Sequence, residues 1–328
     1  MDCFPVETWL HIVALACTDG GRTGRALSLV SRKMLSVVDP IRFRCVLLAH
    51  EDQLRAFSRV LGARDPSPTI HHLLIFVKKH SGGEAGVRDS TENFENSLHK
   101  IISVAAPTVQ TLAVHGITND LGLCNLVFPV LHDLAIDALP SNTASHASCF
   151  PSLRRLHISS HSRRRDFWAD LARFAPALTH LRLSGLTQEA SLSTFLRVLL
   201  KLPAERWSSN VVVAGADSMD DAGEECAPED PAVAAAVARL PALRHVVVQP
   251  LRLEYEGWCG EGPFLHGLMK NGLQRIASAC AQRQGTRNMY LLQDGPRYSL
   301  EDARRDWLDA VEGGEGPWAE GSDANART

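Results

Sequence analysis

Apolar and polar positions alternate along the chain in one short pattern that recurs six times. The pattern is Pro-x-[Ile/Leu/Val]-x-x-[Leu/Val]-x-[Ile/Leu/Val], and its last two apolar positions are two residues apart. Side chains two residues apart share one face of a β-strand, so each copy predicts a short strand with one buried face. The six copies begin at Pro68, Pro107, Pro129, Pro151, Pro176 and Pro241.

Segments with helical periodicity separate these strands, and several of them end just before a repeat proline. Proline disfavours the α conformation in the preceding residue and lacks the amide hydrogen that a helix needs, so it separates each helix from the next strand. Two strands without the proline, residues 211–213 and 288–292, bring the expected number of strands to about eight. The predicted helices are residues 91–105, 166–174, 188–202, 231–240 and 267–284.

The spacing of the copies is nearly regular in the middle of the chain. From Pro107 onward, consecutive copies begin 22, 22 and 25 residues apart. Leucine-rich repeats have a period of about 20–29 residues, and each repeat buries its apolar face by stacking on its neighbours. The region therefore resembles a degenerate leucine-rich-repeat array, without the family's Asn or Cys three residues after the last apolar position. This resemblance implies an irregular α/β solenoid of short parallel strands alternating with helices.

The N-terminal 45 residues follow a different pattern, in which apolar positions recur with the period of an α-helix. Pro5 is well placed at a first helical turn, and a Gly-rich turn at residues 19–21 separates two apolar stripes. Two or three short helices cannot bury this much apolar surface alone, so a partner surface is expected. The stripes consist of Val6, Leu10, Val13 and Cys17, and of Leu27, Val30, Met34 and Val37.

Short motifs in this N-terminal region carry a family resemblance. It opens with Phe-Pro-Val-Glu at residues 4–7 and continues with Val-Ser-Arg at residues 30–32. These motifs resemble the Leu-Pro-x-Glu opening and the later Val-Ser/Cys-Arg/Lys of an F-box, with Phe4 in place of Leu and Met34 where Trp is common. The whole stretch is similar to F-box openings of mushroom-forming (basidiomycete) fungi. The resemblance implies that a Skp-type adaptor is bound by Phe4, Pro5, Glu7, Leu10, Ile12, Val30 and Met34.

Together the two resemblances imply a domain order and a function. The chain is expected to contain a three-helix F-box-like module at residues 1–48, a repeat array at residues 49–312 and a flexible tail at residues 313–328. This combination implies a non-catalytic substrate-recognition subunit of an SCF-type cullin-RING ubiquitin ligase, with a protein target on the repeats. The alternative is a leucine-rich-repeat interaction scaffold outside any ligase, in which the N-terminal helices only cap the first repeat.

Composition and charge narrow the class of protein. The 328 residues include 34 Lys and Arg against 37 Asp and Glu, a net charge of −3 that gives no global attraction to nucleic acid or to an anionic membrane. The eight cysteines form no C-x-x-C pair, and neither a signal sequence nor a membrane span is recognisable, so an intracellular protein, cytoplasmic or nuclear, is expected. Residues 217–230 carry seven acids and no Lys or Arg, which predicts a solvated insertion.

The sequence lacks the common catalytic, cofactor and metal motifs. It contains no G-x-S-x-G, no G-x-x-x-x-G-K-[S/T], no G-x-G-x-x-G and no H-E-x-x-H. We therefore expect no cofactor, no bound metal and no enzymatic activity. A hydrolase or metal enzyme of unrecognised type stays open as the other reading of the 14 histidines.

Histidine and arginine concentrate at the variable positions of the six patterned strands. Six of these 18 positions are His, whereas an even spread of the 14 histidines over 328 residues would place about one there. In a solenoid these side chains project from the strand face opposite the core, where they could pair an acidic or phosphorylated segment of a target. The alternative is that they are ordinary solvated residues. The candidate target-binding residues are His132, Arg154, Arg155, His157, His180, Arg182, Arg244 and His245.

Overall fold

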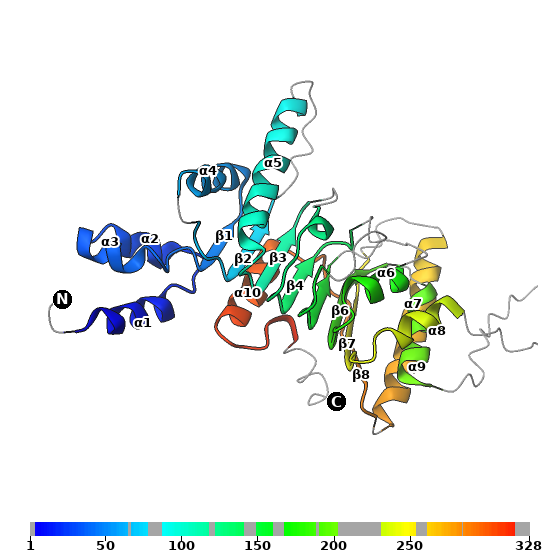
Figure 1. Ribbon diagram of the computed structural model, residues 1–328. Coiled ribbons are helices and arrows are strands. Elements are labelled where there is room, and N and C mark those ends of the chain that lie inside the picture. The colour runs from blue at the N-terminus through cyan, green and yellow to red at the C-terminus, as the bar shows by residue number, and fades with distance from the viewer. Residues whose placement is uncertain are drawn as a thin grey trace, which may run out of the picture.

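The computed structural model describes residues 4–64, 67–77, 87–117, 122–140, 149–159, 167–187, 190–202, 231–253, 261–283 and 285–318. The described residues form one eight-stranded parallel sheet with helices between many of its strands (Figure 1). An α/β fold with alternating strands and helices, as predicted from the sequence, is thereby confirmed. The strands are β1 (Cys45–Leu48), β2 (His72–Phe76), β3 (Thr111–His115), β4 (Asp133–Ile136), β5 (Arg155–Ile158), β6 (His180–Leu186), β7 (His245–Pro250) and β8 (Asn288–Leu291).

The strands lie side by side in the order in which they occur in the chain, from β1 to β8. Doubly wound sheets reverse their strand order at a switch point, and this sheet has no such point among its described strands. An eight-stranded barrel would pair β8 with β1. Here β1 pairs only with β2, and β8 pairs only with β7, among the described strands. The sheet is therefore open, and each strand is added to the edge left by the one before it.

The helices vary more than the strands. The proline pattern predicts a helix end at Pro107, Pro176 and Pro241, and in each case a helix does end shortly before the proline. Only a short 3₁₀ turn, η1 (Leu123–Asn125), is described between β3 and β4. The helices of the sheet region are α4 (Glu51–Gly62), α5 (Val87–Ala105), α6 (Phe167–Phe174), α7 (Ala190–Leu200), α8 (Pro231–Ala238), α9 (Glu261–Ala281) and α10 (Leu300–Val311).

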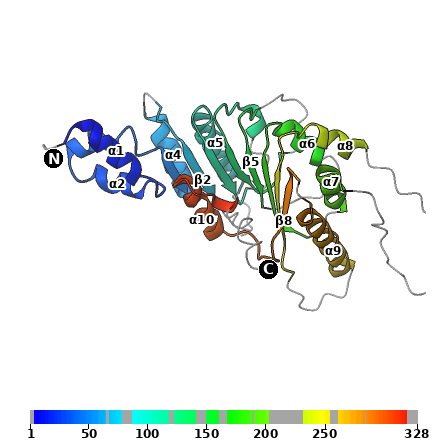
Figure 2. The same cartoon turned by 90° about the horizontal axis from the view of Figure 1, so that it is seen from below.

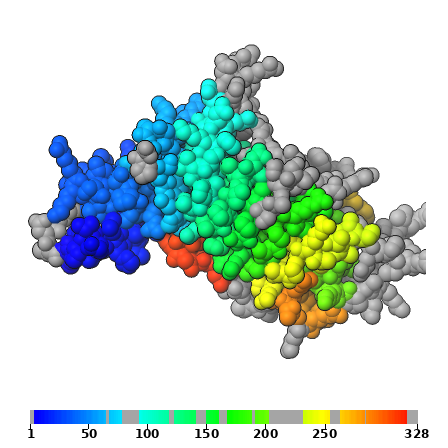
Figure 3. All heavy atoms as spheres, viewed as in Figure 1, coloured from blue at the N-terminus to red at the C-terminus, as the bar shows by residue number. Residues whose placement is uncertain are grey.

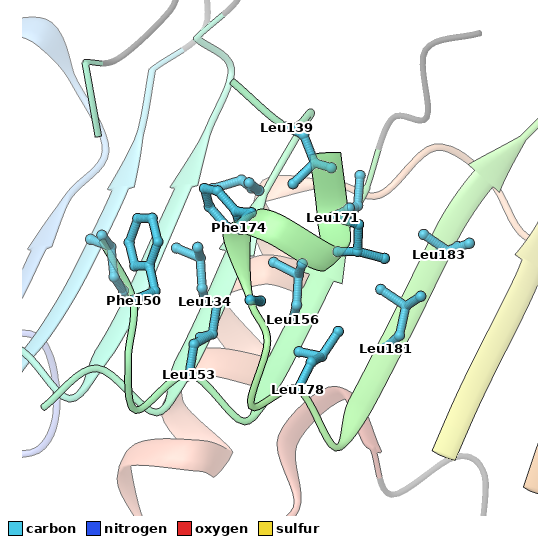
Figure 4. Packing of buried hydrophobic residues seen from close by; sticks show 14 of the residues in the cluster. Leu134, Leu139, Phe150, Leu153, Leu156, Leu171, Phe174, Leu178, Leu181 and Leu183 are labelled. Atoms are coloured by element: carbon cyan, nitrogen blue, oxygen red, sulfur yellow. The ribbon is translucent and has the colours of Figure 1, made fainter. Parts of the chain in front are cut away.

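One face of the sheet carries the main hydrophobic core. Alternate residues of each strand, such as Leu156 and Ile158 in β5, are buried and belong to one continuous cluster with residues of α4 to α9. Figure 4 shows this packing around α6, where Phe174 lies over the strand leucines. Aromatic rings add to it, since the ring centroids of Phe150 and Phe174 are 4.4 Å apart. These are the apolar positions that the repeat pattern marks, so the pattern identifies the core.

The N-terminal helices form a separate small module beyond β1, at the end of the molecule far from β8 (Figures 1 and 3). The module comprises α1 (Val6–Ala16), α2 (Arg22–Ser28) and α3 (Arg32–Val38), and Ser31 caps α3 by accepting a hydrogen bond from the Met34 amide at 3.0 Å. Arg64 joins the module to α4 through an ion pair with Asp39 at 2.5 Å. The core of the module consists of Val13, Cys17, Met34, Val37, Val38 and Ile41.

Several elements differ from the sequence-based expectation. Strand β1 was not predicted, and it belongs to the sheet although the expected module reached residue 48. The strand expected at residues 211–213 and the acidic insertion at residues 217–230 lie outside the described residues. Helices α4 and α10 were not predicted either. Six residues of the expected flexible tail, 313–318, are described, and Gly316 is buried among them.

Candidate functional site

Two surfaces correspond to the two expected binding sites, and the first is the N-terminal module. Among the residues expected to bind an adaptor, Pro5 and Glu7 are exposed, Leu10 is half-buried and Met34 is buried in the module's core. Large apolar side chains on the module are exposed to solvent. The exposed fractions are 58% for Phe4, 47% for Ile12 and 65% for Val30. The module therefore combines a closed apolar interior with an uncovered apolar exterior.

The second surface is the sheet face opposite the helices of the main core, which we call the second face. Because side chains alternate along a strand, the second face holds the residues between the core positions. The parallel register aligns them in rows across the sheet. One row runs from Thr111 through Asp133, Arg155, His180 and His245 to Asn288, and the next from Ala113 through Ala135, His157, Arg182 and Val247 to Tyr290.

The eight candidate target-binding residues divide into three groups by position. The first group precedes the strands and is exposed at the edge where the strands begin: His132, Arg154 and Arg244. The second group lies in the first row of the second face and is half-buried: Arg155, His180 and His245. The third group lies in the next row and is buried, with exposed fractions of 1% for His157 and 3% for Arg182. A single open surface made of all eight side chains, as the sequence suggested, is therefore wrong for the third group.

The third group is buried because the C-terminal segment folds back onto the second face. We call residues 298–318 the C-terminal strap. Its helix α10 contacts β2 and β3, and Trp307 forms a small apolar cluster with Leu74 and Ala113 of these strands. Figure 2 shows α10 on the side of the sheet opposite α4 and α5. The sequence carried one signal of this helix, since Ser299 and Asp302 form a capping box.

Arg182 contacts the far end of the strap through its guanidinium group. It donates a hydrogen bond to the Pro317 carbonyl oxygen and further ones to Ser184 Oγ and Gln249 Oε1, each at 3.3 Å. Trp318 meets the ring of His180 edge to face, with the ring centroids 5.6 Å apart. In the folded chain, Arg182 is therefore a hydrogen-bond donor to a main-chain carbonyl of the strap.

Histidines of the second face have lowered pKa values. His180 stacks on His245 with 4.5 Å between ring centroids. Burial, together with the positive charges of His245 and Arg155, lowers the pKa of His180 to about 4. Complete burial lowers the pKa of His157 well below its ordinary value, and the neighbouring Arg182 and His115 act in the same direction. These two histidines are neutral at pH 7, so they add no positive charge for an acidic ligand.

A hydrogen-bond network anchors one end of the second face. Asp137 accepts hydrogen bonds from the Ser159 hydroxyl at 2.7 Å and the Gly116 amide at 2.6 Å, and its Oδ1 lies 2.9 Å from His115 Nδ1. Burial alone would raise the pKa of Asp137, but the hydrogen bonds from His115, Ser159 and Gly116 outweigh burial and lower it. Ser159 lies beside the carboxylate and Nδ1, so it is not placed as a nucleophile against His115 Nε2. The geometry of this network fits a structural role, in which Asp137 links β3 to the residue that follows β5.

A cavity of about 40 Å³ lies between the strap and the second face, with Tyr298 and Trp318 among its lining residues. Space of this size accommodates at least one water molecule. Three buried polar atoms of its lining have no hydrogen-bond partner among the described residues: His115 Nε2, His157 Nδ1 and Trp307 Nε1. A further lining atom, Asp133 Oδ1, is ion-paired with Arg155 Nε at 3.5 Å. Within the described part of the chain, no group of three or more His, Cys, Asp or Glu side chains is arranged to hold a metal ion.

The fold and these surfaces define an open, all-parallel α/β sheet protein with a separate three-helix module and a strapped second face. Comparisons with protein-family models, with curated proteins and with solved structures found no match to this chain. No helix among the described residues is both long enough and apolar enough to cross a membrane.

Proposed function

We propose that this protein is the substrate-recognition subunit of an SCF-type cullin-RING ubiquitin ligase. In this proposal the N-terminal module is an F-box that binds a Skp-type adaptor, and the sheet region is a leucine-rich-repeat array that binds a target protein. The observation that carries it is the exposed apolar exterior of a module that already has its own core. Ile12 and Val30, both expected to contact the adaptor, are 47% and 65% exposed.

Three features support this assignment over that of a simple helical cap. A cap would turn its apolar residues toward the sheet, whereas the module exposes Leu15 and Leu29 at 72% and 79%. The module also stands beyond the sheet, and its contacts with the α4 region include an ion pair of Arg64 with Asp39 and the guanidinium of Arg64 over the ring of Phe43 at 4.8 Å. A cap would also have no need of the F-box-like motifs at residues 4–7 and 30–32. The sequential strand order fits both readings, since each is built on a solenoid in which a repeat contacts its neighbours.

The proposed activity requires no catalytic residue in this chain. A receptor holds a target beside a charged conjugating enzyme, and this tethering raises the effective concentration of the target's lysines. Once the receptor holds the target, the encounter between the target and the conjugating enzyme takes place within one complex, so a modest affinity on each binding surface is sufficient. In this proposal the exposed apolar residues of the N-terminal module bind the adaptor and the sheet region binds the target.

The test is capture of a purified fungal Skp-type adaptor by the full-length chain. An Ile12→Asp/Val30→Asp variant changes two exposed side chains outside the module's core, so it is expected to stay folded and to lose capture. A Val60→Asp/Val127→Asp variant, at side chains 41% and 64% exposed in the sheet region, is the matched control and should retain capture. Circular dichroism and thermal melting check that all three chains are folded.

Failure of the wild-type chain to capture the adaptor would overturn the ligase assignment. The better account would then be the leucine-rich-repeat scaffold, in which the sheet binds a partner and the N-terminal helices shield one end. Equal loss of capture in both double variants would also contradict the proposal, because it would mean that any added charge prevents binding.

A further inference from the structure

The C-terminal strap lies where a ligand of the second face would lie. Its helix α10 covers β2 and β3, and its last residues reach β6, where Arg182 meets the Pro317 carbonyl oxygen. The strap thus spans several neighbouring strands and buries candidate target-binding residues on the way. Strand β6 and residue 317 are separated by 135 positions in sequence, so the contact is a product of the fold and not of local chain geometry.

The strap has the chemistry of a peptide ligand. Two tryptophans anchor it, because Trp307 is 3% exposed against Leu74 and Ala113, and Trp318 lies edge-on to His180. Residues 298–318 include six acids and two arginines, and exposed acids such as Glu301 and Asp309 stand on the solvent side of α10. An amphipathic helix with aromatic anchors is a common ligand of protein grooves.

The contact between the strap and the second face is imperfectly matched. A cavity lies beneath α10, and its lining includes Trp307 and His157, whose Nε1 and Nδ1 are buried without a hydrogen-bond partner among the described residues. The core on the other face is closely packed around stacked rings, such as Trp168 on Phe195 with centroids 3.6 Å apart. A cavity forfeits close contacts along its lining, so the strap is held less firmly than the helices of the main core.

We propose that the second face is a binding surface for an amphipathic, acidic helix anchored by tryptophan, and that the strap is its built-in occupant. A partner segment of this chemistry binds by displacing the strap, and the strap lowers the partner's apparent affinity by keeping the face occupied. This inference rests on the proposed function only in identifying the partner as a ligase target. It would hold for a scaffold as well, because neither the adaptor nor the N-terminal module takes part.

The experiment measures binding in trans of a fluorescein-labelled synthetic peptide, residues 297–318, to full-length chains by fluorescence anisotropy. Trp318→Ala and Trp307→Ala weaken the chain's own strap and free the face. We expect the peptide to bind each variant at least about tenfold more tightly than the wild-type chain. Glu301→Ala, at an exposed position of α10, is the matched control and should behave as the wild type.

Two further arms decide the outcome. A peptide with alanine at both tryptophans should fail to bind any chain, and Arg182→Gln in the Trp318→Ala background should weaken binding of the normal peptide at least about fivefold. Trp307 lies in a core cluster, so if Trp307→Ala fails to fold, the half-buried Trp318 at the end of the strap decides the result. Equal binding to wild type and Trp318→Ala, or no binding to either, overturns the inference. Neither result depends on whether the adaptor is captured.

Discussion

The two faces of the sheet are built from neighbouring residues of the same strands, yet they are stabilised in different ways. On the helix side, Leu156 and its equivalents form one apolar cluster that runs through α4 to α9. On the second face, the very next residue, His157, is also buried, but one ring nitrogen is hydrogen-bonded to Ser184 Oγ at 3.0 Å and the other has no hydrogen-bond partner among the described residues. Burial alone therefore does not distinguish the faces.

The difference lies in what covers each face and how it is attached. Helices adjacent in sequence to the strands cover the core side, so many of these contacts join neighbouring parts of the chain. The second face is covered by a strap from the end of the chain, through two tryptophans and a few hydrogen bonds. The first arrangement produces stability, and the second produces a contact that can open while the sheet stays folded.

The largest effect is expected from the core side. Leu156→Ala removes a fully buried side chain in β5 and should lower the free energy of unfolding by about 3 kcal/mol, because a cavity remains among close-packed neighbours. Leu156→Met keeps the volume and should cost less than about 1.5 kcal/mol. Urea denaturation measures both values. A loss below about 1 kcal/mol for the alanine variant would mean that this face is not the main source of stability.

Trp307→Ala tests the second face and should act locally. Amide hydrogen exchange in residues 300–311 should become at least about tenfold faster, equivalent to about 1.4 kcal/mol, because the strap can undock before the global unfolding cost is reached. Exchange in α6, on the other face, should not change. Equal acceleration in α6 would contradict the comparison, since both faces would then open as one unit. Glu301→Ala is the control for changes in α10 itself.

Acidification should weaken the strap without any mutation. The pKa of His180 is about 4 and that of His157 is also lowered in the docked chain, in both cases mainly by burial. Undocking removes part of this burial and raises both pKa values toward the ordinary value of about 6.5, while the neighbouring Arg155, His245 and Arg182 stay on the sheet. As the pH falls from 6.5 toward 4, the open state binds protons that the docked state does not, so docking is strongest above pH 7 and weakens below pH 6.5. Around His157 lie Arg182 of β6, His115 of β3 and Tyr298 of the strap.

The expected loss of docking free energy between pH 7 and pH 5 is about 1 kcal/mol, allowing for the partial exposure of His180. Hydrogen exchange in residues 300–311, corrected for the intrinsic effect of pH, measures it. His180→Gln should flatten the pH dependence, because a neutral amide does not titrate. A wild-type chain with no pH dependence in this range would show that the strap stays docked when these rings become charged.

The sequence predicts one face of the sheet far better than the other. The proline pattern marks positions such as Leu181 and Leu183, and each of these is fully buried on the helix side. It misses β1, because Cys-Val-Leu-Leu at residues 45–48 is a four-residue apolar run without proline or alternation. Periodicity identifies which side chains point away from the core, but it does not identify what covers them.

This limit explains the mixed result for the candidate target-binding residues. Arg154 and His157 belong to the same repeat, yet the first is exposed and the second is buried under the strap. No local signal separates them, because the strap comes from more than 130 residues further along the chain. The capping box at Ser299 predicts that a helix starts there, whereas its docking site follows only from tertiary packing.

The smallest effect is expected at the exposed edge of the second face, where Arg154 and Arg244 precede their strands. Arg154→Ser/Arg244→Ser should change the free energy of unfolding by less than about 0.5 kcal/mol, since both side chains are in solvent.

In the Trp318→Ala background, the double variant should weaken binding of the acidic strap peptide about fivefold at low salt. This difference should disappear near 0.5 M salt, as expected for exposed charges. Unchanged binding at low salt would mean that tryptophan and main-chain contacts alone select the ligand. The acidic character of the partner would then have no basis in these arginines, while the aromatic anchoring of the second face would stand.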